Sequence, residues 1–191
     1  MKKATSQDRE IAVDILCRAF INIMVPNSIN YVIKKSGNRY KTLKILMEYQ
    51  FDLSLLYGSI FLSDDNNGCI LYLDQPKFSP KRFILELKLL FCCIGFENIF
   101  KVLKREKLLK SFHPEEKFIH LWLMAVCPDE QGKGIGTKLL QESLAMYRGE
   151  LIYVETTTPE NRTFYSQNGF KIFHETFELD YPLYFLNKTE H

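Results

Sequence analysis

The feature that most constrains this chain of 191 residues is an apolar run that leads into a glycine-rich turn and then a helix. Residues 118–127 are mainly aliphatic and aromatic and precede Pro128, which predicts a buried strand that ends there. Three glycines follow within residues 132–136, residues 136–147 have helical spacing, and residues 151–157 are rich in β-branched side chains. A strand, a helix and a strand in this order predict a parallel pair joined by a right-handed crossover.

The glycine-rich turn has the chemistry of an anion site. Its glycines let backbone N–H groups converge, and the helix N-terminus behind them adds partial positive charge, which suits a phosphate or pyrophosphate. Lys133 supplies a further point charge. The order Gly136-Thr137-Lys138 fails the Walker A pattern, and the late G-x-G-x-G spacing fails the dinucleotide fingerprint. These observations disfavour both of those nucleotide-binding classes.

A second motif, NRTFYSQNGF over residues 161–170, follows a strand and a short helical segment later. Gln131, Gly134 and Gly136 fit the pattern [Q/R]-x-x-G-x-[G/A] after a strand and a proline. The two motifs together resemble the GNAT superfamily of acetyl-CoA-dependent N-acetyltransferases. Its later motif is N-x-x-x-[F/Y]-Y-x-x-x-G-[F/Y], and here one residue fewer separates Asn161 from the aromatic pair. The resemblance is firm over residues 118–170 and looser outside them.

The resemblance implies an α/β fold of the mixed α+β kind: a central, mostly antiparallel sheet with one splayed parallel pair, flanked by helices. It implies that residues 1–191 form a single N-acetyltransferase domain, with a helical insertion at about residues 80–112. The implied activity is transfer of an acetyl group from the co-substrate acetyl-CoA to an amine of a small-molecule acceptor. The alternative is a non-catalytic CoA-binding or sensor module on the same fold.

The resemblance also implies roles for particular residues. Tyr165 would be the general acid that protonates the departing CoA thiolate, because the pKa of a phenol lies slightly above that of a thiol. Backbone groups of the strand would hold the pantetheine arm and the acetyl carbonyl, the turn would hold the pyrophosphate, and Asn161 would bond the pantetheine. The implied acetyl-CoA contacts are Met124, Ala125, Val126, Gln131, Gly132, Lys133, Gly134, Ile135, Gly136, Thr137, Asn161 and Tyr165.

The general base is open at this point, because many relatives use a Glu on the strand before the turn and this strand has none. His120 and Glu155 are the two candidates, and a structural role for either is as strongly favoured. Alternation along the strand predicts that His120 shares a face with Trp122 and Met124. A base acting through a water chain, or an amine that arrives neutral, is a further alternative.

The rest of the chain supplies helices and hairpins. Helical spacing is predicted over residues 6–23, with Ser6 as N-cap, over 39–56, and over two segments, 83–93 and 96–110, broken near Gly95. Strands are predicted at 58–62 and 69–73, joined by hairpin turn chemistry, and at 170–179 and 183–186, while residues 159–167 form a short helix. A solvated basic face is expected from Lys101, Lys104, Arg105 and Lys107, and an acceptor pocket from Tyr31, Tyr40, Tyr72 and Phe78.

Composition excludes several functional classes. The net charge of +2 gives no footprint for nucleic acid, and the most apolar stretch, residues 83–100, is interrupted by charges and favours an amphipathic helix over a membrane span. The five cysteines suit reduced, mostly buried thiols, and the N-terminus has no secretory signal, so we expect a cytoplasmic protein. The four histidines lack ligand spacing, so no metal is expected. The expected assembly is a monomer or homodimer, without a nucleic-acid or membrane partner.

Overall fold

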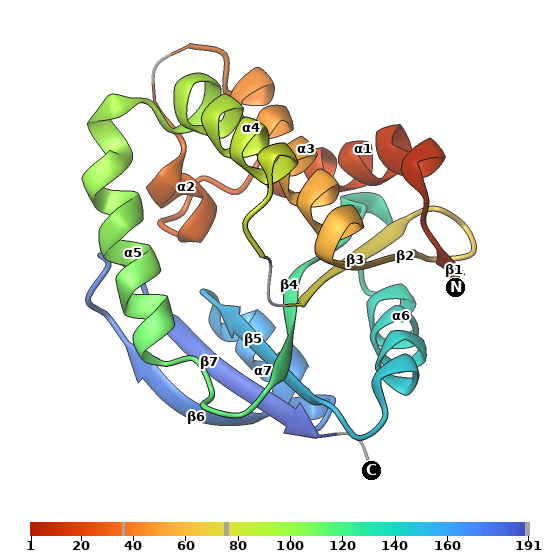
Figure 1. The fold of residues 1–191 in the computed structure, drawn as a ribbon. Coiled ribbons are helices and arrows are strands. Elements are labelled where there is room, and N and C mark those ends of the chain that lie inside the picture. Colours follow the sequence, from red (N-terminus) through yellow and green to blue (C-terminus); the bar gives the residue numbers. More distant parts are fainter. Residues whose placement is uncertain (36, 75–76, 190–191) are drawn as a thin grey trace.

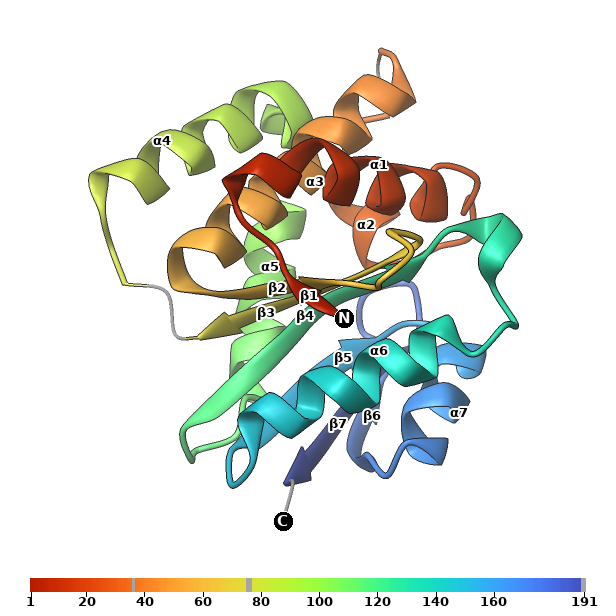
Figure 2. The same cartoon turned by 90° about the vertical axis from the view of Figure 1, so that its right-hand side faces the viewer.

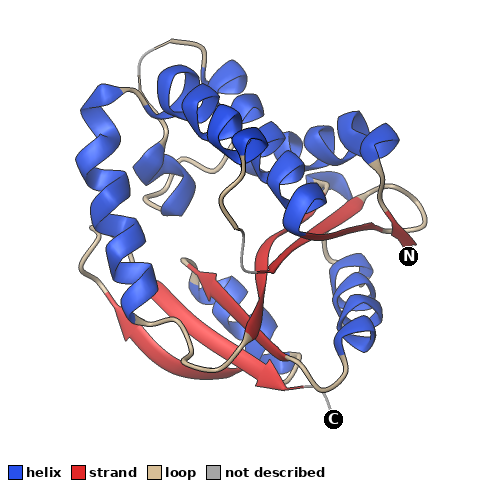
Figure 3. Cartoon of the chain, viewed as in Figure 1, coloured by secondary structure: helices blue, strands red, loops and turns tan. Residues whose placement is uncertain are grey.

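The structure is a computed structural model that describes residues 1–35, 37–74 and 77–189. His191, one of the four histidines, lies outside these residues. The described residues form one mixed, seven-stranded sheet with the strand order β1-β2-β3-β4-β5-β7-β6 and helices against both faces (Figure 1, Figure 3). Neighbouring strands are antiparallel apart from β4 and β5, which are parallel. The predicted mixed sheet, with its crossover through the helix after the glycine turn, is confirmed.

The elements have the following bounds. The strands are β1 Lys2–Lys3, β2 Gly58–Leu62, β3 Gly68–Asp74, β4 Phe118–Val126, β5 Leu151–Thr156, β6 Lys171–Thr176 and β7 Leu183–Thr189. The helices are α1 Arg9–Phe20, α2 Ser28–Val32, α3 Arg39–Tyr57, α4 Pro80–Leu89, α5 Ile99–Ser111, α6 Ile135–Leu144 and α7 Pro159–Gln167. A π-helical turn, Leu90–Ile94, extends α4.

Helices cover the two faces of the sheet in distinct groups (Figure 2). Helices α1 and α3 bury one face of β2, β3 and the end of β4, through residues such as Leu16, Phe51 and Leu71. Helices α6 and α7 bury the other face, where Leu140 and Tyr165 pack. A third cluster joins α5 to β5 and β7 and contains the buried residues Leu109, Tyr153, Leu179, Tyr181, Leu183 and Phe185. Helix α5 of the connection therefore packs against the same sheet that carries the glycine turn, whereas α4 packs against α3.

The start of the chain differs from the prediction in its cap and in an extra helix. Thr5, rather than Ser6, caps the first helical turn, because Thr5 and Asp8 form a reciprocal capping box. Helix α1 ends at Phe20, and Asn27 then caps the short helix α2, which was not predicted. Five residues carry too little periodicity to be recognised from sequence.

The predicted break between the two helices of the connection is confirmed. Ser79 accepts a hydrogen bond from the N–H of Arg82 at the start of α4, as its position before Pro80 suggests. Gly95 has a φ of 74°, a conformation that costs glycine little, and there the chain turns from the extension of α4 toward α5. The two helices consequently run in different directions (Figure 1).

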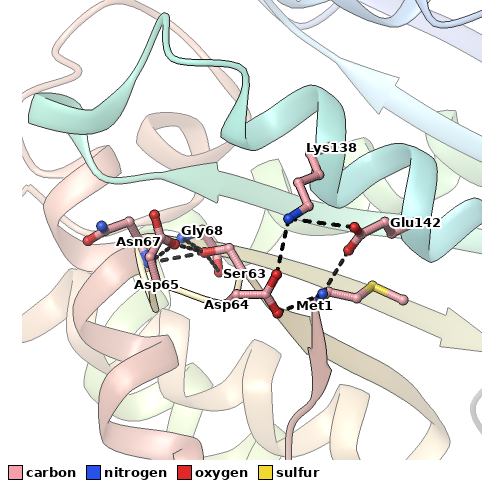
Figure 4. Close-up of polar contacts among 8 residues, drawn as sticks. All are labelled: Met1, Ser63, Asp64, Asp65, Asn67, Gly68, Lys138 and Glu142. Atoms are coloured by element: carbon pink, nitrogen blue, oxygen red, sulfur yellow. Dashed lines mark hydrogen bonds and ion pairs between the residues drawn. The ribbon is translucent and has the colours of Figure 1, made fainter.

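Helix α6 is tied to the hairpin between β2 and β3 by a small ion-pair network (Figure 4). Lys138 lies 3.1 Å from Asp64, and the amine of Met1 lies 2.9 Å from Asp64 and 2.7 Å from Glu142. Ser63 organises the hairpin turn by accepting the N–H of Gly68 at 2.8 Å. These contacts fix the helix that begins at the glycine turn.

In the part of the chain that the structure describes, none of the helices combines the length and apolar character needed to cross a bilayer. All five cysteines are free thiols, and Cys92 alone among them is exposed, in agreement with the predicted buried thiols.

Gly58 is required by a close approach at the start of β2. A Cβ at this position would lie 2.0 Å from the carbonyl oxygen of Tyr72, which is backbone and has little freedom to move. We expect Gly58→Ala to lower the free energy of unfolding by about 3 kcal/mol, the upper range for overpacking. Urea unfolding measures the change.

Gly149→Ala is the matched control, because Gly149 has a φ of 82° and no atom within 4 Å of the added Cβ. We expect Gly149→Ala to lower the free energy of unfolding by only roughly 1–2 kcal/mol, the cost of an alanine in the left-handed conformation. Equal losses for both variants would contradict the steric explanation.

Candidate functional site

The glycine turn leaves its backbone open on one side. Gly132 and Gly134 have φ values of 77° and 82°, and an added Cβ would meet no atom within 4 Å at either residue. Gln131 fixes the turn to the end of β4, because its Nε2 donates to the carbonyl of Val126 at 3.1 Å. The turn thus combines a fixed backbone with free space beside it.

Helix α6 begins directly after this turn and has no capping side chain. Gly134 occupies the N-cap position in the left-handed conformation, so no side-chain oxygen is available to the N–H groups of the first turn. Lys133 forms an exposed ion pair with Glu130 at 2.9 Å. Uncapped N–H groups and the positive end of a helix are the means by which proteins bind phosphate groups. The geometry suits the predicted anion site.

Strands β4 and β5 pair only at their beginnings. The register covers Phe118 with Leu151, Ile119 with Ile152, and His120 with Tyr153. Beyond His120 no described strand pairs with the β5-facing edge of β4, although β5 continues beside β7. The two parallel strands therefore diverge toward the glycine turn (Figure 1).

A β-bulge explains why the strands diverge. Leu71 of β3 pairs with Leu123 and the next residue, Tyr72, pairs with Leu121, which leaves Trp122 as an extra residue in β4. A bulge bends its strand and increases the local twist. The extra residue, Trp122, is two residues after His120, the last residue of β4 that pairs with β5. The bend therefore begins where the pairing of the two strands stops.

The bulge also corrects the predicted faces of β4. His120 lies 5.1 Å from the ring of Tyr153, and Trp122 contacts Tyr49 of α3, so these two side chains lie on the α3 and α5 side. Met124 instead packs on the α6 side, beside Gly136. The prediction that Met124 shares the face of His120 is wrong, because one extra residue inverts the alternation beyond it.

The two candidate bases form a direct contact. His120 Nε2 lies 2.7 Å from Glu155 Oε2, and the Glu155 side chain is 7% exposed. Arg105 of α5 reaches the same carboxylate, with its Nη2 3.8 Å from Oε1. His113 and Tyr153 lie beside His120, with ring centroids 6.4 Å and 5.1 Å from its ring. Residues far apart in the sequence thus meet on one side of the divergent strands.

Charges beside Glu155 keep it ionised. Burial acts to raise the pKa of this carboxyl, but His120 and Arg105 outweigh burial and hold the pKa below its ordinary value of 4.5. An ionised Glu155 accepts a hydrogen bond from Nε2 of His120. In a neutral imidazole that bond leaves Nδ1 as the atom that can accept a proton.

Arg105 corrects the prediction of a uniformly solvated basic face. Its side chain is 14% exposed and turns toward Glu155, while Lys104 and Lys107 stay on the exposed surface. The spacing of Arg105 from Val102 and Leu109 placed it on the apolar stripe of α5, which is the signal that could have found it.

The later motif places one side chain inside the molecule and another at the surface. Tyr165 of α7 is buried, with its ring 5.3 Å from Phe164 and 5.4 Å from Phe170. Burial, with a smaller contribution from the charge of Glu155, raises the pKa of Tyr165. Tyr165 therefore stays protonated at neutral pH. Asn161, by contrast, lies in the first turn of α7 and its side chain is exposed.

The expected acceptor pocket does not form. Tyr72 is fully buried under α6 and its hydroxyl lies 2.8 Å from Ser143, whereas Tyr40 and Phe78 are exposed. Tyr31 packs edge-on against Tyr181. Tyr72 pairs with Leu121, which follows His120 in β4, and neighbouring residues of a strand alternate in direction. Tyr72 therefore lies on the opposite face of the sheet from His120. Among the described residues, no cluster of three or more His, Cys, Asp or Glu side chains could hold a metal.

Comparison with a family model identifies the central part of the chain. Residues 93–172 match the model described as an acetyltransferase (GNAT) domain. The match includes β4, the glycine turn, Glu155 and Tyr165, so it coincides with the region where the two sequence motifs lie.

Comparison with solved structures extends the likeness to the whole fold. A structure from Corynebacterium glutamicum, described as histone acetyltransferase HPA2 and related acetyltransferase, is 22% identical and superposes with a TM-score of 0.73, covering 100% of this chain and 95% of that one. Arylalkylamine N-acetyltransferase 2 from Aedes aegypti is 18% identical with a TM-score of 0.63, covering 100% and 98%. The C-terminal condensation domain of Ebony, in complex with beta-alanyl-dopamine, is 11% identical with a TM-score of 0.66, covering 98% and 96%.

Ionisation of Glu155 makes its contribution to stability depend on pH. Because the folded-state pKa is lowered, the stabilisation is present above the ordinary value of 4.5 and is lost as pH falls through the lower folded-state pKa. We expect Glu155→Gln to reduce the free energy of unfolding by about 2 kcal/mol at pH 7, and the difference to shrink below about pH 4. Urea unfolding at several pH values measures it.

Glu160→Gln, on the exposed start of α7, is the control and should change little at any pH. A Glu155→Gln deficit that is the same at neutral and acidic pH would contradict the assignment of an ionised carboxylate.

Proposed function

We propose that this chain is a member of the GNAT acetyltransferase superfamily and that it transfers an acetyl group from acetyl-CoA to the amine of a small molecule, which the family match over residues 93–172 supports. One observation carries this proposal: β4 and β5 diverge immediately before an open, uncapped glycine turn. The divergence leaves strand backbone available to an extended ligand, and the turn offers an anion site at the end of the same strand. A phosphorylated, elongated thioester has this combination of parts.

The donor is proposed to bind along β4. The pyrophosphate would contact the N–H groups of residues 131–137, with Lys133 adding charge, and backbone groups of Met124, Ala125 and Val126 would hold the pantetheine arm and the acetyl carbonyl. Asn161 is proposed to bond the pantetheine from the start of α7. The fit is supported by the open space beside Gly132 and Gly134 and by the unpaired edge of β4.

His120 is proposed as the general base, with Glu155 as its positioning residue. The bond of 2.7 Å between them supports this division, since it orients the imidazole and leaves Nδ1 to accept a proton. The amine nitrogen attacks the thioester carbonyl carbon and gives up a proton to His120 as the new C–N bond forms. The β4 backbone would stabilise the oxygen on which negative charge develops.

Tyr165 is proposed to protonate the leaving group. When the C–S bond breaks, the sulfur takes the electron pair as a thiolate, and the phenol proton of Tyr165 passes to it. The role requires a phenol that is protonated at neutral pH, and Tyr165 meets this requirement; burial holds its pKa further above the thiol value of about 8.5, so bound substrate has to bring the sulfur directly to the hydroxyl. The charge that makes the smaller contribution to this raised pKa belongs to Glu155, the proposed positioning residue.

A small amine is proposed as the acceptor because the site's neighbourhood is aromatic and basic, with His113, Tyr153 and Arg105 around Glu155. The chain as a whole has a net charge of +2 and so lacks the surplus acidic charge that would attract a basic peptide tail. The names of two solved relatives, an arylalkylamine N-acetyltransferase and a domain bound to beta-alanyl-dopamine, agree with this class. We also propose that the whole chain is one domain and acts as a monomer or homodimer.

Binding of acetyl-CoA is tested at Gly134. Aspartate and asparagine both tolerate the left-handed conformation and have nearly the same shape, so they differ here mainly in charge. We expect Gly134→Asp to weaken acetyl-CoA binding by about tenfold or more relative to Gly134→Asn, because its carboxylate would face the pyrophosphate. Isothermal titration calorimetry measures both dissociation constants.

Equal affinities for the two Gly134 variants would place the pyrophosphate elsewhere. No acetyl-CoA binding by the folded wild-type protein would overturn the proposed donor.

Chemistry is tested at Tyr165. Tyr165→Phe removes the proton donor and keeps the ring packing, so we expect kcat to fall about 100-fold while acetyl-CoA affinity stays nearly constant. An amine panel with a thiol-release readout supplies the rates. Tyr147→Phe, a tyrosine that contacts Tyr72 on the α6 side, should keep the wild-type kcat. Unchanged turnover in Tyr165→Phe would contradict the acid role, and acetyl-CoA binding without turnover on any amine would favour the sensor module.

A further inference from the structure

The helical connection exposes an unusual number of large apolar side chains. Five of them are more than half exposed: Ile84, Phe91, Phe96, Phe100 and Leu103. They follow helical spacing on α4 with its extension and on α5, so each helix turns one apolar stripe outward. Contiguous exposed apolar surface of this kind marks an interaction site.

The two stripes join where the helices meet. The rings of Phe91 and Phe96 lie 5.6 Å apart across Gly95, so the apolar surface continues around the corner between the π-helical turn and α5. At the far end of α4, the rings of Phe78 and Phe83 lie 6.5 Å apart. A shallow groove extends the surface onto the end of α3 and is lined by Asp52, Leu55, Leu56, Lys81, Ile84 and Leu85; Asp52 is paired with Arg9.

Basic side chains are frequent in the segment that carries the apolar stripes. Residues 77–110 contain nine Lys or Arg and three Glu, a net charge of +6, although the whole chain has only +2. Arg105 is on the inner face of α5 and Lys88 pairs with Glu48 of α3, so at most the other seven reach the outer surface. On α5 the series Phe96, Phe100, Leu103, Lys107 and Lys110 follows one face, so the stripe passes from apolar to basic along the helix. The remainder of the chain carries a net charge of −4.

We infer that the outer faces of α4 and α5 dock on an anionic lipid surface. Amphipathic helices with aromatic and aliphatic residues on the inserted side and lysines beside them bind the interface of a bilayer without crossing it. The excess positive charge matches anionic headgroups. A second copy on the same patch would meet the same charge, because a two-fold interface opposes identical surfaces. This revises the expectation that no membrane is a partner.

The docked position has a consequence for the site. Helix α5 carries Phe100 and Leu103 on its outer face and Arg105, which reaches Glu155, on its inner face. A helix is about 10 Å wide, so a bilayer at the outer face of α5 would lie roughly 10 Å from Arg105 on the inner face.

The test uses the full chain and vesicles of phosphatidylcholine, with or without roughly 30% phosphatidylserine, in a flotation assay. We expect binding to the serine-containing vesicles, loss of that binding in high salt, and little binding to phosphatidylcholine alone. The triple variant Phe96→Ser, Phe100→Ser, Leu103→Ser should bind about tenfold or more weakly. Lys107→Glu combined with Lys110→Glu should do the same, because each basic residue near the surface contributes about a fivefold factor.

The control variant Met146→Ser, Phe177→Ser removes two exposed apolar side chains outside the patch and should bind like the wild type. Circular dichroism checks that every variant is folded. The inference is overturned if the wild type shows no preference for anionic vesicles, or if the triple variant binds them as well. Sedimentation equilibrium tests whether a second copy of the chain covers the patch instead. A wild-type dimer that the triple variant abolishes, together with no vesicle binding, would assign the patch to a second copy.

Discussion

The early end of pairing between β4 and β5 is the constraint on which the rest of the site depends. Three residue pairs hold the two strands together, and the extra residue Trp122 then bends β4 away. The loss of hydrogen bonds along that edge has a cost in any folded protein, because strand backbone needs partners. An extended ligand with amide groups of its own can supply the missing hydrogen bonds. The unpaired edge of β4 is therefore both a cost to the fold and the basis of binding.

The bulge also decides which side chains reach the site. It leaves His120 on the side of α5 and turns Met124 toward α6, so a titratable group and an apolar group of one strand serve opposite faces. Helix α5 then supplies Arg105 from the other side of Glu155. The resulting cluster draws on β4, β5 and the connection before β4, which makes the connection part of the site's electrostatics rather than a cover.

The sequence predicted the glycine turn, the parallel crossover and nearly all long elements, because each carries strong local signals: glycine spacing, β-branched runs and helical periodicity. It did not predict the bulge, since nothing in residues 118–126 marks Trp122 as the extra residue. It named His120 and Glu155 separately, because the contact between them depends on the register of two parallel strands. Charge alone assigns Arg105 to the solvated face of α5, whereas its position on an apolar stripe of that helix turns it inward. The predicted acceptor pocket of Tyr31, Tyr40, Tyr72 and Phe78 does not form, because Tyr72 lies on the opposite face of the sheet and bonds Ser143 there.

Helix α5 is one rigid rod with two differently occupied faces. Its inner face holds Arg105 against a buried carboxylate, and its outer face exposes Phe100 and Leu103. Anything that moves the rod relative to β5 changes the distance between Arg105 and Glu155, and thereby the balance of charge around His120. If a ligand at one face shifts the helix, thermodynamic linkage requires the affinity at the other face to change by the same factor. One helix thus borders both the exposed apolar stripe and the buried carboxylate.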